Sequence, residues 1–190
     1  MDPNDEQLVR LCKQQLPYDA TAFEVLLRRY EKIVFRSCER YLRNEQEAEE
    51  ACQDAFLRVF HGLPSFEGRA KFRTWLFRIV INVCATRFAK VSRRAGEHRE
   101  YAETTAAEMA VGYEPKPMDF ADVNGVIGEG LDMLSPDDRQ ILILRHIGEL
   151  SFDELAATLE LGLSAAKMRL YRAEQRLKTA YDSAAKESEQ

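Results

Sequence analysis

The chain has 190 residues, of which 45% are hydrophobic and 31% charged, and its formal net charge is −5. This composition is typical of a folded protein with room for one medium domain or two small ones, and no apolar run approaches the roughly 20 residues needed to cross a bilayer. The opening MDPNDEQ has neither the basic nor the apolar part of a signal peptide, so we expect a cytoplasmic protein without membrane insertion.

Residues able to carry catalysis or hold a metal are scattered along the chain. Its four cysteines and three histidines form no CxxC or other zinc-ligand spacing. The sequence also lacks a phosphate-binding glycine loop and a credible Ser/His/Asp set. We therefore expect no cofactor, no small-molecule substrate and no enzymatic activity. Cys52 and Cys84 have apolar neighbours and are expected to be buried, reduced thiols.

Two helices are expected between residues 5 and 43. Leu8, Leu11 and Cys12 repeat at helical spacing, and Pro17 ends this short run. From Thr21 a second apolar stripe continues for about six turns, with Thr21 as the expected N-cap and Glu24 as its capping-box partner. This stripe consists of Phe23, Leu26, Leu27, Tyr30, Ile33, Val34 and Tyr41.

The next helix, NEQEAEEACQDAFLRVFHGL, is expected to begin at Asn44 or the residue before it and to stop at Gly62. Its apolar stripe consists of Ala48, Cys52, Phe56, Val59 and Phe60. Carboxylates crowd its other faces at the first turns. They favour a helix N-terminus through the helix dipole, but so dense a cluster could equally bind a basic partner, and the residues alone leave both readings open.

Basic and aromatic residues then interleave from Ser65 to Lys90, which reads as one long helix. Its core-facing stripe consists of Phe72, Trp75, Ile79 and Val83. Lys71, Arg78 and Asn82 fall together beside that stripe and form a basic, amide-bearing edge. Residues 66–99 carry nine basic and two acidic side chains, a net of +7. So basic a segment in an acidic chain is typical of a surface that binds phosphates. Composition alone is equally consistent with an ordinary solvent-exposed helix face.

The composition changes abruptly after residue 99. Residues 100–138 contain ten acidic side chains and one basic side chain, a net of −9. Gly112, Pro115 and Pro117 lie near the middle, and apolar periodicity is weak. Residues 96–119 are therefore predicted to form a flexible acidic linker.

A second folded unit is expected over residues 120–182. One helix is expected around residues 123–131, and Ser135 followed by Pro136 begins another that ends before Gly148. Ser151 and Ser164 are expected to cap the last two helices, which a glycine-bearing turn separates. This spacing is typical of a helix-turn-helix, and residues 164–178 carry five basic and one acidic side chain, a net of +4.

The run EAEEACQDAFLRVFHGLPSFEGRAKFRTWLFRIVINVCATRF resembles region 2 of bacterial RNA polymerase sigma factors of the extracytoplasmic-function (ECF) subfamily, over roughly residues 21–94. The second unit is similar to region 4 of the same family. The resemblance implies an all-α fold, with region 2 over residues 5–95, the acidic linker over 96–119 and the region 4 helix-turn-helix over 120–182. It also implies a sigma factor that binds core RNA polymerase, directs it to specific promoters and promotes DNA opening in a stress or envelope response.

Site residues follow from the resemblance. Glu50, Gln53 and Asp54 match the positions that bind the clamp of the polymerase β′ subunit. The positions for the minus-ten element are Phe66, Gly68, Ala70, Lys71, Phe72, Arg78 and Asn82. A base flipped out of the DNA strand needs an aromatic or apolar pocket, a flexible backbone such as glycine provides, and polar groups that hydrogen-bond to the edge of the base. The positions for the minus-thirty-five element are Ser164, Lys167, Arg169, Tyr171, Arg172 and Arg176.

The resemblance has departures and further implications. Arg78 and Ile79 stand where primary sigma factors carry paired tryptophans, so strand opening is expected to need a closely matching promoter. Ser164 and Lys167 begin the last helix differently from the usual family pattern, so no base preference is transferred. The implied partners are promoter DNA, the β′ clamp and β flap of core polymerase and, for many members, an anti-sigma factor.

A second class of function shares the helix-turn-helix. A regulator that binds operator DNA without polymerase would account for the basic last helix, but it gives no reason for the acidic run EAEEACQDAF beside SFEGRAKFRTW. Retention of core polymerase in a pull-down distinguishes the two classes.

Overall fold

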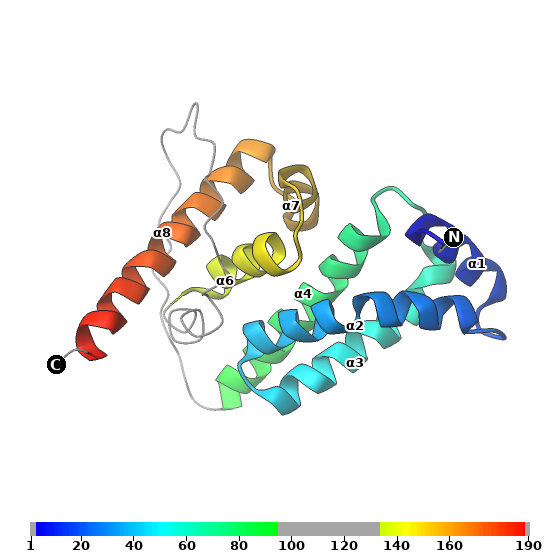
Figure 1. The fold of residues 1–190 in the computed structure, drawn as a ribbon, viewed down its shortest axis with the longest axis horizontal. Helices are drawn as coiled ribbons and strands as arrows, with labels where there is room; N and C mark the ends of the chain where they lie inside the picture. Colours follow the sequence, from blue (N-terminus) through cyan, green and yellow to red (C-terminus); the bar gives the residue numbers. More distant parts are fainter. Residues whose placement is uncertain (1–2, 95–133, 189–190) are drawn as a thin grey trace.

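The computed structural model of the chain describes residues 3–94 and 134–188, and all regular structure in these two ranges is helical (Figure 1). The first range forms helices α1 (Asp5–Gln15), α2 (Thr21–Leu42), α3 (Glu45–Gly62), η1 (Leu63–Ser65) and α4 (Phe72–Arg94). The second forms α6 (Pro136–Leu142), η4 (Ile143–Ile147), α7 (Phe152–Leu159) and α8 (Leu163–Ser188). The predicted all-α fold is confirmed. The linker at 96–119 and the helix expected around 123–131 lie outside the described residues.

Polar side chains begin three of the helices as the sequence predicts. Asn44 accepts a hydrogen bond from the backbone N–H of Glu47 at 2.9 Å, and Ser135 accepts one from Asp138 at 3.1 Å. Ser151 and Glu154 form a reciprocal capping box at the start of α7. Each cap provides a partner for a backbone N–H that the first turn leaves without one.

Two predicted caps are wrong. The backbone N–H of Thr21 donates to the carboxylate of Asp19 at 2.9 Å, and Ala20 occupies the cap position of α2 without a side-chain bond. A charged carboxylate is the stronger acceptor, and the hydrogen bonds from Thr21 lower the pKa of Asp19. Ser164 lies inside α8, which begins at Leu163, because the N–H of Ala166 bonds to the carbonyl of Gly162.

The core of the first range lies between α2, α3 and α4, with α1 packed across one end (Figure 1). The side chain of Tyr30 on α2 donates a hydrogen bond to Asp5 on α1, which also pairs with Arg29. Burial of the predicted stripe of α2 is confirmed in large part, since Phe23, Leu26, Tyr30, Val34 and Tyr41 are all buried.

All four cysteines are free and buried, as predicted for Cys52 and Cys84. A hydrogen bond with Cys84, together with burial, raises the pKa of the Cys38 thiol. Burial likewise raises the pKa of Cys52 to about 12. These thiols therefore remain protonated, which is the unreactive form.

The two described ranges share one hydrophobic cluster. Leu134, Ile141, Leu144 and Leu150 belong to the same buried cluster as Leu76 of α4. In Figure 1, α6 and α7 lie beside α4, and α8 extends away from the N-terminal helices. None of the described helices has the length and apolar character that a membrane span requires.

Candidate functional site

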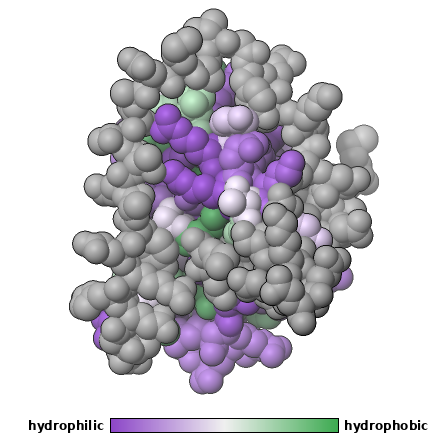
Figure 2. Space-filling view, turned by 90° about the vertical axis from the view of Figure 1, so that its left-hand side faces the viewer, coloured by the Kyte–Doolittle hydropathy of each residue, from purple (hydrophilic) through white to green (hydrophobic). Residues whose placement is uncertain are grey.

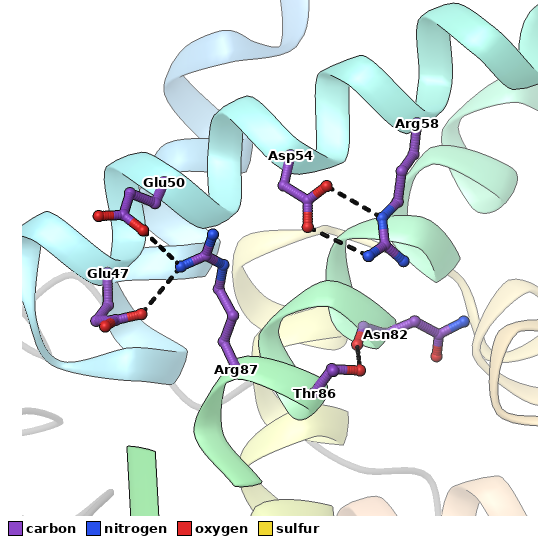
Figure 3. Close-up of polar contacts among 7 residues, drawn as sticks. All are labelled: Glu47, Glu50, Asp54, Arg58, Asn82, Thr86 and Arg87. Carbon is purple, nitrogen blue, oxygen red and sulfur yellow. Dashed lines mark hydrogen bonds and ion pairs between the residues drawn. The ribbon is translucent and has the colours of Figure 1, made fainter. Parts of the chain in front are cut away.

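The acidic face of α3 carries the residues predicted to bind polymerase. Glu50 and Gln53 are exposed and Asp54 is partly exposed. The carboxylates of Glu50 and Asp54 each accept charge-assisted hydrogen bonds (Figure 3). Arg58, one turn further along α3, donates to both carboxylate oxygens of Asp54 at 3.2 Å. This bidentate pair fixes the direction in which the Asp54 carboxylate points.

Arg87 of α4 joins the two helices at the start of this acidic face. Its Nη1 atom lies 3.0 Å from Glu47 Oε2 and 2.9 Å from Glu50 Oε2 (Figure 3). Partial burial acts to lower the pKa of the Arg87 guanidinium, but the hydrogen bonds to Glu50 and Glu47 raise it overall. From the sequence, Arg87 was predicted only as one of the basic residues that could contact phosphates. The carboxylates of the preceding helix were the sequence signal that it could instead have a partner within the protein.

The loop between η1 and α4 holds an aromatic stack. The ring of Phe66 lies 4.8 Å from that of Trp75, centroid to centroid, at an interplanar angle of 36°. Lys13 of α1 donates to the backbone carbonyl of Phe66 at 2.8 Å and anchors the loop to the N-terminal helix. Gly68 has a φ of 75°, a left-handed conformation that favours glycine, and Ala70 is exposed. The loop therefore presents a small, glycine-bearing rim beside two aromatic rings.

The remaining predicted minus-ten residues differ in accessibility. Phe72 is only 6% exposed and packs edge-on against Tyr30, so its ring forms part of the core beneath Phe66. Asn82 is exposed, and its amide points away from the α3 carboxylates (Figure 3). Its backbone carbonyl, rather than its amide, accepts the hydrogen bond from Thr86. The amide of Asn82 is therefore presented at the surface of α4.

Three basic residues of α4 and the preceding loop face carboxylates of the second range. Lys71 Nζ lies 3.1 Å from Glu154 Oε1. Arg78 forms an ion pair with Glu160. Arg73 lies 3.1 Å from Glu149 and also donates to the backbone carbonyl of Gly148. The sequence predicted Lys71 and Arg78 on one basic edge. In the structure both side chains stay exposed on that edge, and each pairs with a carboxylate of α7 or of its C-terminal turn.

The helix-turn-helix of the second range consists of α7, the turn around residues 160–162 and α8. Ser164 is exposed at the start of α8, and Lys167 Nζ lies 5.4 Å from the centre of the Phe152 ring. Tyr171 and Arg172 are partly exposed one turn further on. Figure 2 views the side on the left of Figure 1, where the visible described residues are mainly hydrophilic.

Two predicted DNA-binding residues of α8 have intramolecular partners on α6. Arg169 Nη2 lies 3.1 Å from Asp137 Oδ1. Arg176 donates to the largely buried carboxylate of Asp138 at 2.6 Å. These pairs hold α6 against α8, and both guanidinium groups therefore contribute to packing as well as to the charge of the helix.

The comparisons with known proteins agree on one family. The model described as "Sigma-70 region 2" matches residues 26–94, and "Sigma-70, region 4" matches residues 125–177. The two ranges contain 69 and 53 residues, together more than half of the 190-residue chain. They include α3, α4 and the loop between them in the first match, and the helix-turn-helix in the second.

Three sigma factors align with most of this chain. The chain is 29% identical to the ECF RNA polymerase sigma factor SigW of Bacillus subtilis, over 87% of this chain and 92% of SigW. It is 26% identical to the RNA polymerase sigma-H factor of Pseudomonas aeruginosa, over 89% of each chain. The ECF RNA polymerase sigma-E factor of Escherichia coli K12 is also 26% identical, over 82% of this chain and 84% of its own.

Solved structures have the same fold. CnrH, in complex with the cytosolic domain of CnrY, superposes with a TM-score of 0.68 at 23% identity, over 94% of this chain and 97% of CnrH. The sigma factor RpoE, in complex with the anti-sigma factor NepR from Bartonella quintana, gives a TM-score of 0.61 at 24% identity, over 84% of this chain and 96% of RpoE. With both sigma-70 regions matched in order and sigma factors aligned along nearly the whole length, the chain belongs to the ECF group of the sigma-70 family.

Proposed function

We propose that this chain binds core RNA polymerase, carries it to promoters that contain two matching elements, and promotes opening of the DNA there. The observation that carries the proposal is the arrangement of the first helical bundle. It exposes directed carboxylates on α3 and a surface amide on the adjacent α4, and a helix-turn-helix follows in the same chain. An operator-binding regulator needs only the last of these three features.

The acidic face of α3 is the proposed polymerase contact. Glu50, Gln53 and Asp54 would bind the β′ clamp, and region 4 would bind the β flap. Arg87 and Arg58 hold the Glu50 and Asp54 carboxylates in place before binding, which reduces the side-chain entropy lost when the complex forms. Charge complementarity of this kind increases the rate and specificity of association.

Promoter reading is divided between the two regions. Phe66, Gly68 and Ala70 would receive a base extruded from the minus-ten element, with Asn82 reading an adjacent edge through its donor and acceptor. Lys167 and Arg172 would approach the minus-thirty-five element in the major groove, where a cation can donate to guanine. Because one polymerase joins the two contacts, two weak interactions combine into one specific complex.

The protein would supply positioning while polymerase performs the chemistry, so no catalytic group of its own is required. We place this activity in the cytoplasm, where the template DNA is, and within a stress or envelope response like that of many ECF factors. An anti-sigma factor is a further proposed partner, since the two solved structures named above are both complexes with a second protein.

Transcription in vitro with purified core polymerase on a genomic promoter library tests the function directly. We expect initiation at a defined set of sites, and initiation from none would overturn the proposal. Asp54→Arg should abolish retention of core polymerase in a pull-down, because it places a cation on the acidic face. Glu31→Arg, an equal change at an exposed position on α2, is the matched control and should bind normally. The Arg58–Asp54 pair is a partly exposed i,i+4 pair and contributes at most about 0.5 kcal/mol, so the variant is expected to fold.

A further inference from the structure

A lysine of α1 bonds to the loop that is proposed to receive the minus-ten base. Lys13 Nζ donates to the backbone carbonyl of Phe66 at 2.8 Å, and the two residues are 53 positions apart in the chain. Helix α1 ends at Gln15, whereas the match to sigma-70 region 2 begins at residue 26. The contact therefore comes from a helix outside the residues that the family model matches.

Helix α1 is itself held firmly against the rest of the bundle. Near its start, the carboxylate of Asp5 accepts hydrogen bonds from both Arg29 and Tyr30 of α2. Its inward side chains are buried in the same cluster as Leu63 of η1, and they are Leu8, Val9 and Cys12. Because the backbone of α1 is packed in this way, it provides a fixed support from which Lys13 can hold the loop.

The first residues of the loop are fixed from several directions at Phe66. The backbone N–H of Phe66 donates to the carbonyl of Leu63 at 3.1 Å, and its ring lies 4.8 Å from that of Trp75. The Trp75 ring is also close to the last residue of α3, since a Cβ added at Gly62 would lie 2.9 Å from Trp75 Cζ2. The Lys13 bond thus holds the backbone of a residue whose ring belongs to a packed aromatic cluster.

The loop is open beyond Phe66. Residues 67–70 are all exposed, and Glu67 pairs with Arg69 within the loop. A Cβ added at Gly68 would have no neighbouring atom within 4 Å. The position of this open segment relative to the aromatic rings therefore depends on how the loop is held at its first residue.

We propose that Lys13 is a positioning residue for capture of the minus-ten base. Its ammonium group holds the Phe66 backbone so that residues 67–70 stay beside the aromatic rings, in the arrangement that the extruded base enters. The inference rests on the proposed role of this loop in promoter reading. A loop held in place before binding loses less conformational freedom when the base arrives. Lys13 acts through Phe66 and need not touch the DNA.

A direct phosphate contact is the competing role for an exposed lysine beside this loop. Such a contact positions a strand without distinguishing its bases. It would strengthen binding whether or not a base is present to enter the loop. A positioning role strengthens binding only when that base is present, and the two roles are therefore separable.

Trp75 is the one tryptophan of the chain, and its fluorescence reports on the loop. Lys13→Met removes the ammonium group at similar side-chain size, Lys13→Arg keeps a charged donor, and Lys32→Met is the matched control at an exposed position of α2. We expect acrylamide to quench Trp75 more strongly in Lys13→Met than in the parent, because the Phe66 ring is released. Lys13→Arg and Lys32→Met should resemble the parent. Equal quenching in all of these proteins would overturn the proposal.

Strand capture is measured with holoenzyme and a fluorescein-labelled single strand that carries the minus-ten element of a promoter the parent chain recognises. Abasic substitution at each position in turn identifies the captured base, where binding by the parent falls most. Lys13→Met should bind the intact strand about threefold more weakly than the parent, a modest loss because the bond is exposed to water. It should bind the strand without that base as well as the parent does. Lys13→Arg should recover binding of the intact strand.

Equal weakening on the intact and abasic strands would assign Lys13 to a phosphate contact and overturn the positioning role. Loss of core polymerase retention in Lys13→Met, measured in a pull-down, would assign the residue to the fold and overturn it as well. If the parent directs initiation while Lys13→Met and Lys32→Met bind the intact strand equally, the positioning role is wrong and the sigma function stands. If the parent initiates from no template, the proposed function fails and the role of Lys13 fails with it.

Discussion

The guanidinium of Arg139 in α6 donates a hydrogen bond to the backbone carbonyl of Tyr41, 98 residues earlier in the chain. That carbonyl lies in the last turn of α2, where helix carbonyls lack partners within the helix. A cation there also interacts favourably with the helix dipole. One buried side chain of region 4 thus completes the end of a region 2 helix.

Replacing Arg139 with Ala should therefore lower the free energy of unfolding by about 2–3 kcal/mol, because a buried hydrogen bond to a charged group is lost and a carbonyl is left unpaired. Urea unfolding followed by circular dichroism measures the change. Arg36→Ala, at an exposed position of α2, should stay within about 0.5 kcal/mol of the parent. Equal stability of the two variants would show that the contact contributes nothing in solution.

Arg87 and Arg58, both drawn in Figure 3, should differ in how much their ion pairs stabilise the protein. Arg87 is 24% exposed and bridges α4 to two carboxylates of α3, so Arg87→Ala should destabilise the protein by about 1–2 kcal/mol. Arg58 pairs within α3 at i,i+4 and is more exposed, so Arg58→Ala should change stability by at most about 0.5 kcal/mol. Thermal unfolding of both variants at low and high salt tests this order, and a larger loss for Arg58→Ala would contradict it.

Local signals predicted much of the fold. Apolar periodicity predicted most helices of the described ranges, but the helix expected from Ser65 begins only at Phe72. Asn44, Ser135 and Ser151 marked the starts of three helices, since each signal depends on residues within one turn. The contact between the regions has no such signal. Glu149 and Arg73 lie 76 residues apart, and nothing in their own sequence neighbourhoods specifies that they meet.

The same limit applied to the candidate site. The family resemblance predicted which residues contact polymerase and DNA, but it did not distinguish exposed side chains from buried ones. Phe72 and Asn82 were predicted together, yet one is buried and the other exposed. Arg176 was predicted from its place on a basic helix, while its short bond to Asp138 depends on how α6 packs on α8.

Alkaline pH should destabilise the protein through its buried thiols. Burial raises the pKa of Cys12 to about 11, with its backbone hydrogen bond acting in the other direction. In the unfolded chain this thiol ionises near its ordinary value of about 8.5, so the unfolded state loses its proton first. The stabilisation is complete below that pH and is lost as the pH rises towards the folded value.

The measurement is the urea midpoint at neutral pH and at about pH 10, for the parent and for Cys12→Ala. The variant starts lower because a buried side chain is truncated, but its decline with pH should be smaller by about 1–2 kcal/mol. Equal declines would rule out Cys12 as a contributor. Lysine and tyrosine titrations affect both proteins alike and cancel in the comparison.

Two arginines one turn apart on α8 should separate DNA binding from folding. Arg172→Ala should weaken binding to duplex DNA containing the minus-thirty-five element by about 1–3 kcal/mol if it contacts a base, with little change in stability. Arg176→Ala removes the guanidinium 2.6 Å from the buried Asp138 carboxylate and should lower stability by about 1–2 kcal/mol. Fluorescence anisotropy with a promoter duplex and urea unfolding measure the two effects. A stability loss in Arg172→Ala equal to that in Arg176→Ala would assign both residues to the fold.

Phe72 and Asn82 provide the corresponding comparison for the minus-ten element. Phe72→Ala removes a ring that is 6% exposed and should destabilise the protein by about 3–5 kcal/mol, the usual range for a buried phenylalanine. Asn82→Ala changes an exposed side chain and should leave stability within about 0.5 kcal/mol. Abortive transcription on a premelted template, compared with a duplex template, then measures strand recognition by holoenzyme. Because the lost amide can both donate and accept, Asn82→Ala should reduce initiation on both templates, and Asn82→Asp should restore it only in part. Full activity of Asn82→Ala on both would remove this residue from the site and leave the aromatic loop as the reader of the strand.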